Sequence, residues 1–216
     1  MKNIASLLIV FTLLISLKTT AQSSPLEFGL KAGANYAKFT SDRESEFGNT
    51  AEFKYKPGFY LGGFLDYGIS EKIRFQPEVL LALQGTRLVT TIQDMGNFEN
   101  SPSVSEFEST TNELALLLPL EFRYFLGEKF FIEAGPQFAY VLDRKDKIKD
   151  NPYAMEGDAN EVPGYDYDKF DLGFSLGIGY RLSDDFAITG RYFRSLIERD
   201  ETIKSSVFHL GLEYKL

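Results

Sequence analysis

The sequence predicts an all-β protein, an eight-stranded antiparallel up-and-down transmembrane β-barrel. Three observations lead to this fold class. Apolar and polar residues alternate in eight segments, as in "FDLGFSLGIGYRL" at residues 170–182, and period-two alternation is typical of a β-strand whose two faces meet different surroundings. Short and long connections between the segments alternate along the chain. One face of each segment is also too bulky to fit inside a narrow barrel.

The N-terminal residues predict a leader rather than part of the fold. Lys2 precedes the apolar stretch "IASLLIVFTLLISL", and the small-residue sequence "TTA" ends at Ala21. This order is typical of a secretory signal peptide. A transmembrane anchor is the alternative, but a spanning helix needs about 20 apolar residues. We therefore expect a signal peptide at 1–21 and a single outer-membrane β-barrel domain at 22–216, with strands as the means of membrane insertion.

The composition excludes several classes of protein. The chain has no cysteine, which excludes a disulfide framework and a thiolate metal site. The formal net charge is −8, and removing Lys2 and Lys18 with the leader makes it −10. This acidic balance argues against a nucleic-acid partner.

The expected strands follow one another in hairpins. They are residues 26–40, 57–69, 73–85, 114–126, 130–142, 170–182, 186–198 and 206–216. Three links, "SEK", "GEK" and "SDD", have three residues each, which is a common hairpin length. The apolar residues flanking each of these turns should pair: Ile69 with Ile73, Leu126 with Phe130, and Leu182 with Phe186.

The remaining links are long and polar. They are the expected loops 41–56, 86–113, 143–169 and 199–205. Short turns at one end and long loops at the other are typical of a small outer-membrane barrel, with the turns and both termini in the periplasm and the loops outside the cell. A soluble barrel of the lipocalin type can share the strand count, so the two faces of the strands must decide between them.

The apolar face of the strands predicts contact with lipid. In the segment 114–126 this face is Leu114, Leu116, Leu118, Leu120, Phe122, Tyr124 and Leu126. The interior of an eight-stranded barrel is only just wide enough for side chains to fill, and leucine and phenylalanine at nearly every inward position would overfill it. We therefore expect the bulky face to point outward into the membrane.

The opposite face carries glycines and charges, which should point into the lumen. Counting from the turns places Arg123 opposite Glu133, Asp66 opposite Gln76, and Gly177 opposite Arg191, and opposite charges at paired positions attract. The expected lumen charge network is Asp66, Arg74, Glu78, Glu121, Arg123, Glu133, Arg191 and Glu213. We interpret it as a structural plug in which charges neutralise one another, and an ion or proton path is the alternative.

Three prolines fit this scheme poorly. Pro77, Pro119 and Pro136 fall inside expected strands, and a closed barrel has no edge that tolerates a missing amide donor. We expect them at bulges or near the membrane boundary.

Several blocks of the sequence resemble a known family. "YKPGFYLGGFLDYGIS", "FQPEVLLALQG", "LPLEFRYFLGEKFFIEAGPQFAYVL" and "LGFSLGIGYRLSDDFAITGRYFRSL" resemble, in this order, the PorT-like outer-membrane β-barrel proteins of Bacteroidota, within the porin family of outer-membrane barrels. The resemblance implies insertion by the barrel-assembly machinery, and some such relatives take part in protein secretion. It carries no catalytic motif. The last strand ends in Leu216, where phenylalanine is usual.

Residues that could carry catalysis are few, and we expect no enzyme, cofactor or metal site. His209 lies on the inner face, and Glu213 is about 13 Å further along the strand, too far for direct contact. Ser175 and Ser195 are the candidate nucleophiles of a lipid-modifying enzyme, but nothing places either beside His209. A lumen histidine is the preferred interpretation.

The loops suggest partners rather than chemistry. The stretches "DRESEFGNTAEF" and "EGDANEVPGYDYD" are acidic, but their spacing matches no calcium loop, so solvated loops are favoured over calcium binding. In "DRKDKIKD", the cations Arg144, Lys145, Lys147 and Lys149 could contact lipopolysaccharide phosphates. The favoured alternative is a strand that continues above the membrane with a polar exterior.

Taken together, the sequence favours an integral outer-membrane barrel with a structural or interaction role. It would be a subunit of an outer-membrane assembly, such as a secretion-related complex, with outer-membrane lipid and lipopolysaccharide around it. A protein partner would bind through loops 41–56, 86–113 and 143–169. A narrow channel or transport component is the alternative, and a lipid-modifying enzyme is less favoured.

Overall fold

Eight strands account for most of the chain that can be described. The computed structural model describes residues 26–41, 50–94, 103–149, 167–199 and 203–216. The strands are β1 Leu26–Ser41, β2 Thr50–Gly68, β3 Ile73–Asp94, β4 Ser103–Phe125, β5 Phe130–Lys149, β6 Phe170–Arg181, β7 Phe186–Ser195 and β8 Ile203–Lys215. The expected signal peptide at 1–21 lies outside the described residues.

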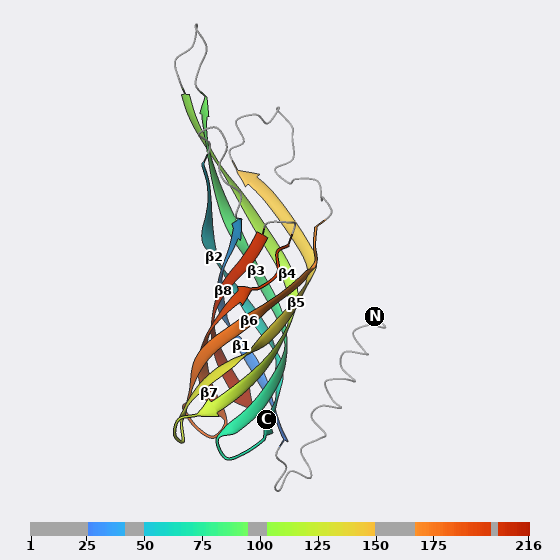
Figure 1. The fold of residues 1–216 in the computed structure, drawn as a ribbon, viewed down its shortest axis with the longest axis vertical. Coiled ribbons are helices and arrows are strands. Elements are labelled where there is room, and N and C mark those ends of the chain that lie inside the picture. The colour runs from blue at the N-terminus through green and yellow to red at the C-terminus, as the bar shows by residue number, and fades with distance from the viewer. Residues whose placement is uncertain (1–25, 42–49, 95–102, 150–166, 200–202) are drawn as a thin grey trace.

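The strands close into a barrel. Each pairs antiparallel with its neighbour in the chain, and β8 pairs with β1 to complete the ring, as in Lys31 opposite Glu213. Figure 1 shows the strands tilted around a long axis, with the three short turns at one end. We call this the turn end and the opposite end the loop end. The predicted fold class is confirmed. Among the described residues, no helix is long and apolar enough to cross a membrane.

The three short turns have the predicted register. In each, the amide before the turn donates to the carbonyl after it: Ile69 to Ile73 at 2.9 Å, Leu126 to Phe130 at 2.9 Å and Leu182 to Phe186 at 2.8 Å. Two turns begin with a serine whose hydroxyl accepts from the backbone three residues on, Ser70 from Ile73 and Ser183 from Phe186, each at 3.1 Å. These local bonds favour tight turns and so fix the pairing of whole strands.

At the loop end, four strands run much further than predicted. β2 already begins at Thr50, β3 continues to Asp94, β4 begins at Ser103 and β5 continues to Lys149. The strands therefore include residues 50–56, 86–94, 103–113 and 143–149 of the expected loops 41–56, 86–113 and 143–169, and those predictions are corrected. β7, by contrast, ends at Ser195, before the predicted end at residue 198. The prediction ended each strand where the apolar alternation stops. Backbone pairing does not need an apolar face, and a sheet above the membrane meets water on both sides.

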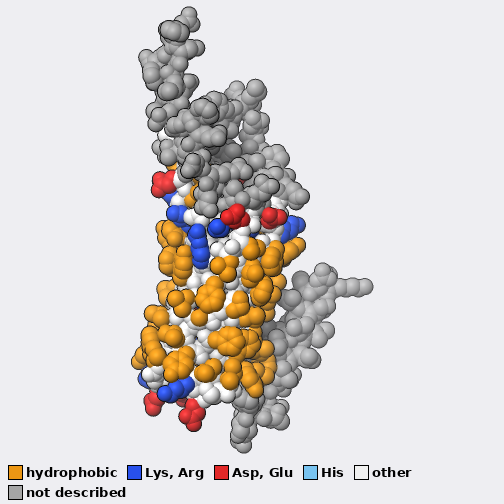
Figure 2. Space-filling view, in the orientation of Figure 1, with side chains coloured by type: hydrophobic (Ala, Val, Ile, Leu, Met, Phe, Trp, Pro, Cys, Tyr) orange, Lys and Arg blue, Asp and Glu red, His pale blue; other side chains and the backbone are white. Residues whose placement is uncertain are grey.

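The outer surface forms an apolar belt. Phe59, Leu61, Phe122, Leu176 and Leu210 are each between 53% and 66% exposed although the residues beside them in the strands face inward. In Figure 2 the belt is an orange band with charged side chains above and below it. The predicted orientation, with the bulky face outward, is confirmed by this exposure. So large an unpartnered apolar surface is characteristic of a face that meets lipid.

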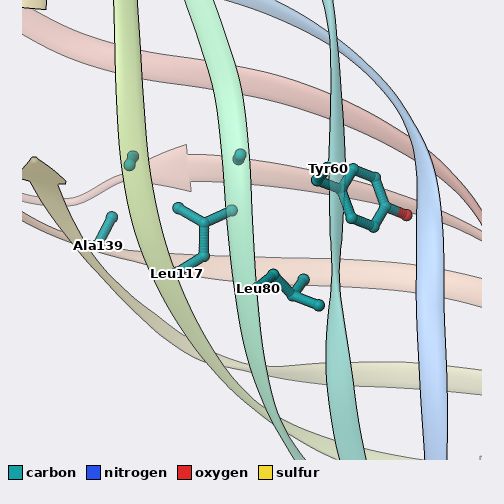
Figure 3. Packing of buried hydrophobic residues seen from close by; sticks show 6 residues of the cluster. Tyr60, Leu80, Leu117 and Ala139 are labelled. Atoms are coloured by element: carbon teal, nitrogen blue, oxygen red, sulfur yellow. The ribbon is translucent and has the colours of Figure 1, made fainter. Parts of the chain in front are cut away.

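The inside of the barrel is packed with rings over glycines. The ring of Phe64 lies where a Cβ on Gly29 would be, at 2.1 Å, and Phe131 lies over Gly179 at the same distance. These two glycines therefore make room for aromatic rings. Tyr60 lies in the apolar cluster of Figure 3, toward the loop end, with Leu80, Ala82, Ala115, Leu117 and Ala139.

The prolines do not lie at bulges. Pairing between β3 and β4 keeps one register from Pro77 opposite Leu120 to Leu80 opposite Leu117. Pro119 and Pro136 are likewise paired in register, with Gln137 and Phe174. The register shifts lie elsewhere, between Tyr55 and Phe59 and between Leu114 and Ala115. The expectation of bulges is therefore wrong. A proline removes one donor, and the long ladders on either side hold the register.

Candidate functional site

The lumen is crossed by a layer of buried charged side chains, which we call the middle layer. Each of its residues is at most 6% exposed. Its members are Lys31 of β1, Glu78 of β3, Glu121 and Arg123 of β4, Glu133 of β5, Arg191 of β7 and Glu213 of β8. They face inward because they alternate with the lipid-facing residues of their strands.

Arg123 joins two carboxylates from opposite sides of the lumen. Its Nε donates to Glu133 Oε2 at 2.9 Å, while Nη1 and Nη2 donate to the two oxygens of Glu213 at 2.9 and 2.6 Å. Arg123 and Glu133 are paired across β4 and β5 as the turn predicts. The fork on Glu213 is the bidentate arrangement in which an arginine binds a carboxylate most strongly.

Arg191 and Lys31 extend the layer to β7, β3 and β1. Arg191 donates from Nε to Glu133 Oε1 at 2.9 Å and from Nη2 to Glu78 Oε1 at 2.9 Å. Lys31 Nζ lies 2.9 Å from both Glu78 and Glu213. Glu133 therefore bridges two arginines, and each cation has at least two carboxylate partners.

Glu121 stands apart from the other three glutamates. Its nearest cation atom is Arg191 Nη1 at 3.3 Å, and its Oε2 is buried without a hydrogen-bond partner. The Ser175 hydroxyl lies within hydrogen-bond distance of both Glu121 Oε1 and the Gly135 carbonyl, the latter at 3.0 Å. The hydroxyl has a single proton, which either acceptor can take. Glu121 is therefore the glutamate of the middle layer with the weakest ion pairing.

A second charged group closes the turn end. Arg74 donates to Asp66 at 2.6 Å and to Glu27 at 2.7 Å, and Lys215 lies 3.7 Å from Asp66. Arg181 is held over the Phe125 ring, 4.1 Å from its centroid. These groups join β1, β2, β3 and β8 just beneath the middle layer.

A third group closes the lumen toward the loop end. Arg199, which follows β7, lies 3.2 Å from Glu113 of β4 and 3.7 Å from Asp171 of β6. The Ser195 hydroxyl donates to Asp171 at 2.8 Å. Because Arg199 crosses the lumen, it fixes the start of the β7–β8 connection against the far wall.

The described part of the lumen leaves little space for a ligand or an ion path. The cavity at the turn end has a volume of about 10 Å³, and the cavity between Tyr60, Arg191 and His209 has about 0 Å³. A single water needs about 10–15 Å³. The charged layers and the rings between them thus fill the barrel at these two points.

The structure divides the predicted network and adds to it. Asp66 and Arg74 belong to the turn-end group, and the other six predicted residues lie in the middle layer. The prediction left out Lys31, which the alternation already placed on the inner face. It also missed Asp171, which lies on the inner face of the expected strand 170–182, and Glu113, which precedes the expected strand 114–126. Arg199 fell in the expected loop 199–205, which offered no periodic signal.

The candidate catalytic residues lie in separate places. His209 packs edge-on against the Tyr60 ring, with 5.2 Å between centroids. Ser175 is engaged with Glu121 and Gly135, and Ser195 with Asp171. No group of three or more metal-binding side chains that could hold an ion occurs among the residues described.

The cations of 143–150 do not act as one outward patch. Arg144 faces the lumen, 3.0 Å from Asp146 and 3.9 Å from Glu113. Lys145 and Lys147 are exposed. β5 runs to Lys149, so the preferred expectation of a continuing strand with a polar exterior is confirmed. Within the acidic stretches, residues 42–49 and 156–166 lie outside the described residues.

Comparison with protein families supplies the identity of this barrel. Residues 20–200 match the family described as "Outer membrane protein beta-barrel domain". The chain belongs to this family. The outer membrane barrel therefore presents its apolar belt to the lipid of that membrane.

Three solved structures share part of the chain path at low sequence identity. Ail, the attachment invasion locus protein of Yersinia pestis, is 12% identical with a TM-score of 0.47, covering 88% of this chain and 99% of its own. OprG from Pseudomonas aeruginosa is 12% identical with a TM-score of 0.46, covering 88% and 95%. Neisserial surface protein A is 13% identical with a TM-score of 0.41, covering 89% and 98%. A comparison with curated proteins finds no match.

Proposed function

We propose that this outer membrane barrel has a structural or interaction role, as a subunit of an outer-membrane assembly such as a secretion-related complex. The filled and ion-paired lumen carries the proposal. Because the protein's own side chains occupy the lumen, a partner or ligand would bind to the outer surfaces of the barrel. The resemblance to PorT-like barrels of Bacteroidota supports a secretion-related assembly, and the N-terminal pattern supports export by a cleaved signal peptide.

The strand extensions at the loop end form the proposed partner surface, which we call the protruding sheet. It comprises residues 50–55 of β2, 86–94 of β3, 103–113 of β4 and 143–149 of β5. In Figure 1 the β3–β4 hairpin rises well above the barrel. The β5 border is rich in lysine, and lysine on a sheet edge discourages unspecific strand addition. A partner would therefore bind the face of this sheet and the adjoining loops 41–56, 86–113 and 143–169.

A shortened hairpin tests this role. Replacing residues 90–107 by Asn-Gly leaves Val89 opposite Glu108, a pair already in register, and Asn-Gly is a favoured two-residue hairpin turn. Particles extracted from the outer membrane in mild detergent would be weighed before and after this change. The proposal expects a stoichiometric second chain in the native particle and its loss from the shortened variant. A native particle of barrel and detergent alone would contradict it.

The channel alternative has its own measurement. A narrow channel predicts conductance in planar bilayers that changes when Arg123 or Glu133 is neutralised. The proposal expects no steady conductance from the native barrel. An enzyme would instead alter lipid A in a manner dependent on His209, so an unchanged lipid profile in His209→Ala supports the non-enzymatic role.

A further inference from the structure

The outer surface of β1, β8 and β7 carries two ordered rows at the loop end. The lower row is aromatic, and the Tyr192 and Phe208 rings lie 4.7 Å apart. The upper row is polar and contains two cations. Register places Tyr36, Phe208 and Tyr192 side by side in the lower row, and Lys38, Ser206 and Arg194 in the row above.

The two cations of the upper row are each held by contacts with neighbouring strands. Arg194 Nη1 donates to the Ser206 hydroxyl and to Thr40 Oγ1, the latter at 3.3 Å. The side chain thus reaches from β7 across β8 to β1, a span of about 10 Å between strands. Lys38 stands two residues before Thr40 on β1, with Nζ 5.5 Å from the centroid of the Tyr55 ring. Hydrogen bonds and ring packing therefore preorganise both groups.

Within the described part of the chain, these cations have no acidic partner. Among the described residues, neither Lys38 nor Arg194 has a carboxylate within 4.0 Å. The neighbouring Lys204, by contrast, pairs with Glu198 at 2.9 Å, and each cation of the middle layer has at least two carboxylates. Lys38 and Arg194 flank Ser206 in the same row, so an anion from outside that contacts both would stabilise this arrangement.

We infer that Lys38 and Arg194, with Thr40 and Ser206, bind the phosphate of a membrane lipid whose acyl chains cover the belt below. The aromatic row marks the level of the lipid headgroups, because tyrosine gathers at that depth in barrels. Figure 2 shows Lys and Arg side chains along the upper border of the apolar band. Arginine suits phosphate because its fork offers parallel donors. This site lies around the barrel from β5, where the cations of 143–150 were expected to act.

The test is lipid binding by the full-length mature barrel in detergent, followed by native mass spectrometry with diphosphorylated lipid A as the probe. Lys38→Gln/Arg194→Gln is expected to weaken binding by about 30-fold, from about 1 kcal/mol per surface cation. The dephosphorylated lipid is expected to bind the native barrel no better than it binds the variant. Thr40→Val keeps both charges but frees the guanidinium, and it should weaken binding by a few-fold. The gel mobility shift of the folded barrel verifies that each variant is folded.

The matched control is Lys145→Gln/Lys147→Gln, which removes two exposed cations from β5 at the same end. It should leave lipid A binding within about twofold of the native value. An equal loss in both double variants would show unspecific attraction and overturn the site. Unchanged binding in Lys38→Gln/Arg194→Gln would also overturn it. Displacement of the lipid by millimolar inorganic phosphate would make the ligand a free anion rather than a lipid.

Discussion

Neutralising two glutamates of the middle layer should have very different consequences. Glu133 accepts hydrogen bonds from Arg123 at 2.9 Å and from Arg191 at 2.9 Å, and it is fully buried. In Glu133→Gln the two guanidinium groups share an amide in place of a charge. Breaking a buried ion pair by removing one partner costs about 3–5 kcal/mol, and we expect the free energy of unfolding to fall by that amount.

Glu121→Gln is the matched comparison, on the neighbouring strand in the same layer. The layer has three cations and four carboxylates. Glu121 pairs with Arg191 at 3.3 Å, whereas Glu133 pairs with both Arg123 and Arg191. Because Arg191 keeps its two other carboxylates and an amide oxygen can still accept from Ser175, Glu121→Gln should change the free energy of unfolding by less than about 1 kcal/mol.

The assay is reversible urea unfolding of the barrel in detergent micelles, followed by the gel mobility shift of the folded form and by tyrosine fluorescence. The difference between the two variants is the informative quantity, because both change one oxygen to nitrogen in the lumen. Equal destabilisation would refute the weaker ion pairing of Glu121. A Glu133→Gln barrel within about 1 kcal/mol of the native one would refute the ion-pair account of the middle layer.

Three further predictions concern the lumen and its walls. The native barrel should pass no steady current across a planar bilayer, and open single-channel events would contradict the filled lumen. Gly179→Ala places a Cβ 2.1 Å from the Phe131 ring and should lower the free energy of unfolding by about 1–3 kcal/mol. In the control Gly63→Ala, the Cβ would be 3.4 Å from its nearest neighbour, and the free energy of unfolding should fall by less than about 0.5 kcal/mol. Arg199→Gln removes a buried partner of Glu113 and should lower the free energy of unfolding by about 3 kcal/mol. Amide hydrogen exchange in β8 near Ser205 should become faster. Unchanged exchange there would show that Arg199 does not hold the β7–β8 connection.

The ends of the strands above the apolar belt were not predicted from the sequence. Within the belt, each strand was recognisable because lipid and lumen demand different side chains at alternate positions. Above the belt, Arg87 and Lys145 face water on a sheet that is polar on both sides, so the alternation that marks a strand fades. Pairing continues there because it depends on the backbone, which the residue types do not reveal.

The contacts across the lumen could be predicted from the sequence only in part. Arg123 and Glu133 could be paired from sequence because a three-residue turn sets the register of adjacent strands. The bonds from Arg123 to Glu213 and from Lys31 to Glu78 join residues 90 and 47 positions apart. They depend on the tilt of the strands and on the closure of β8 against β1. Counting residues from the hairpin turns gives the register of adjacent strands but not these contacts across the lumen.

The strand order, the turns and the lipid-facing side of each strand follow from the amino-acid sequence, because lipid requires an apolar side chain at every second position of a strand that crosses it. The charges that meet across the lumen, the rings that fill the space beside glycines and the cations that share a row on the outer wall become apparent only in the folded barrel. These depend on how far the strands tilt and shear when the sheet closes, and closure is a property of all eight strands together.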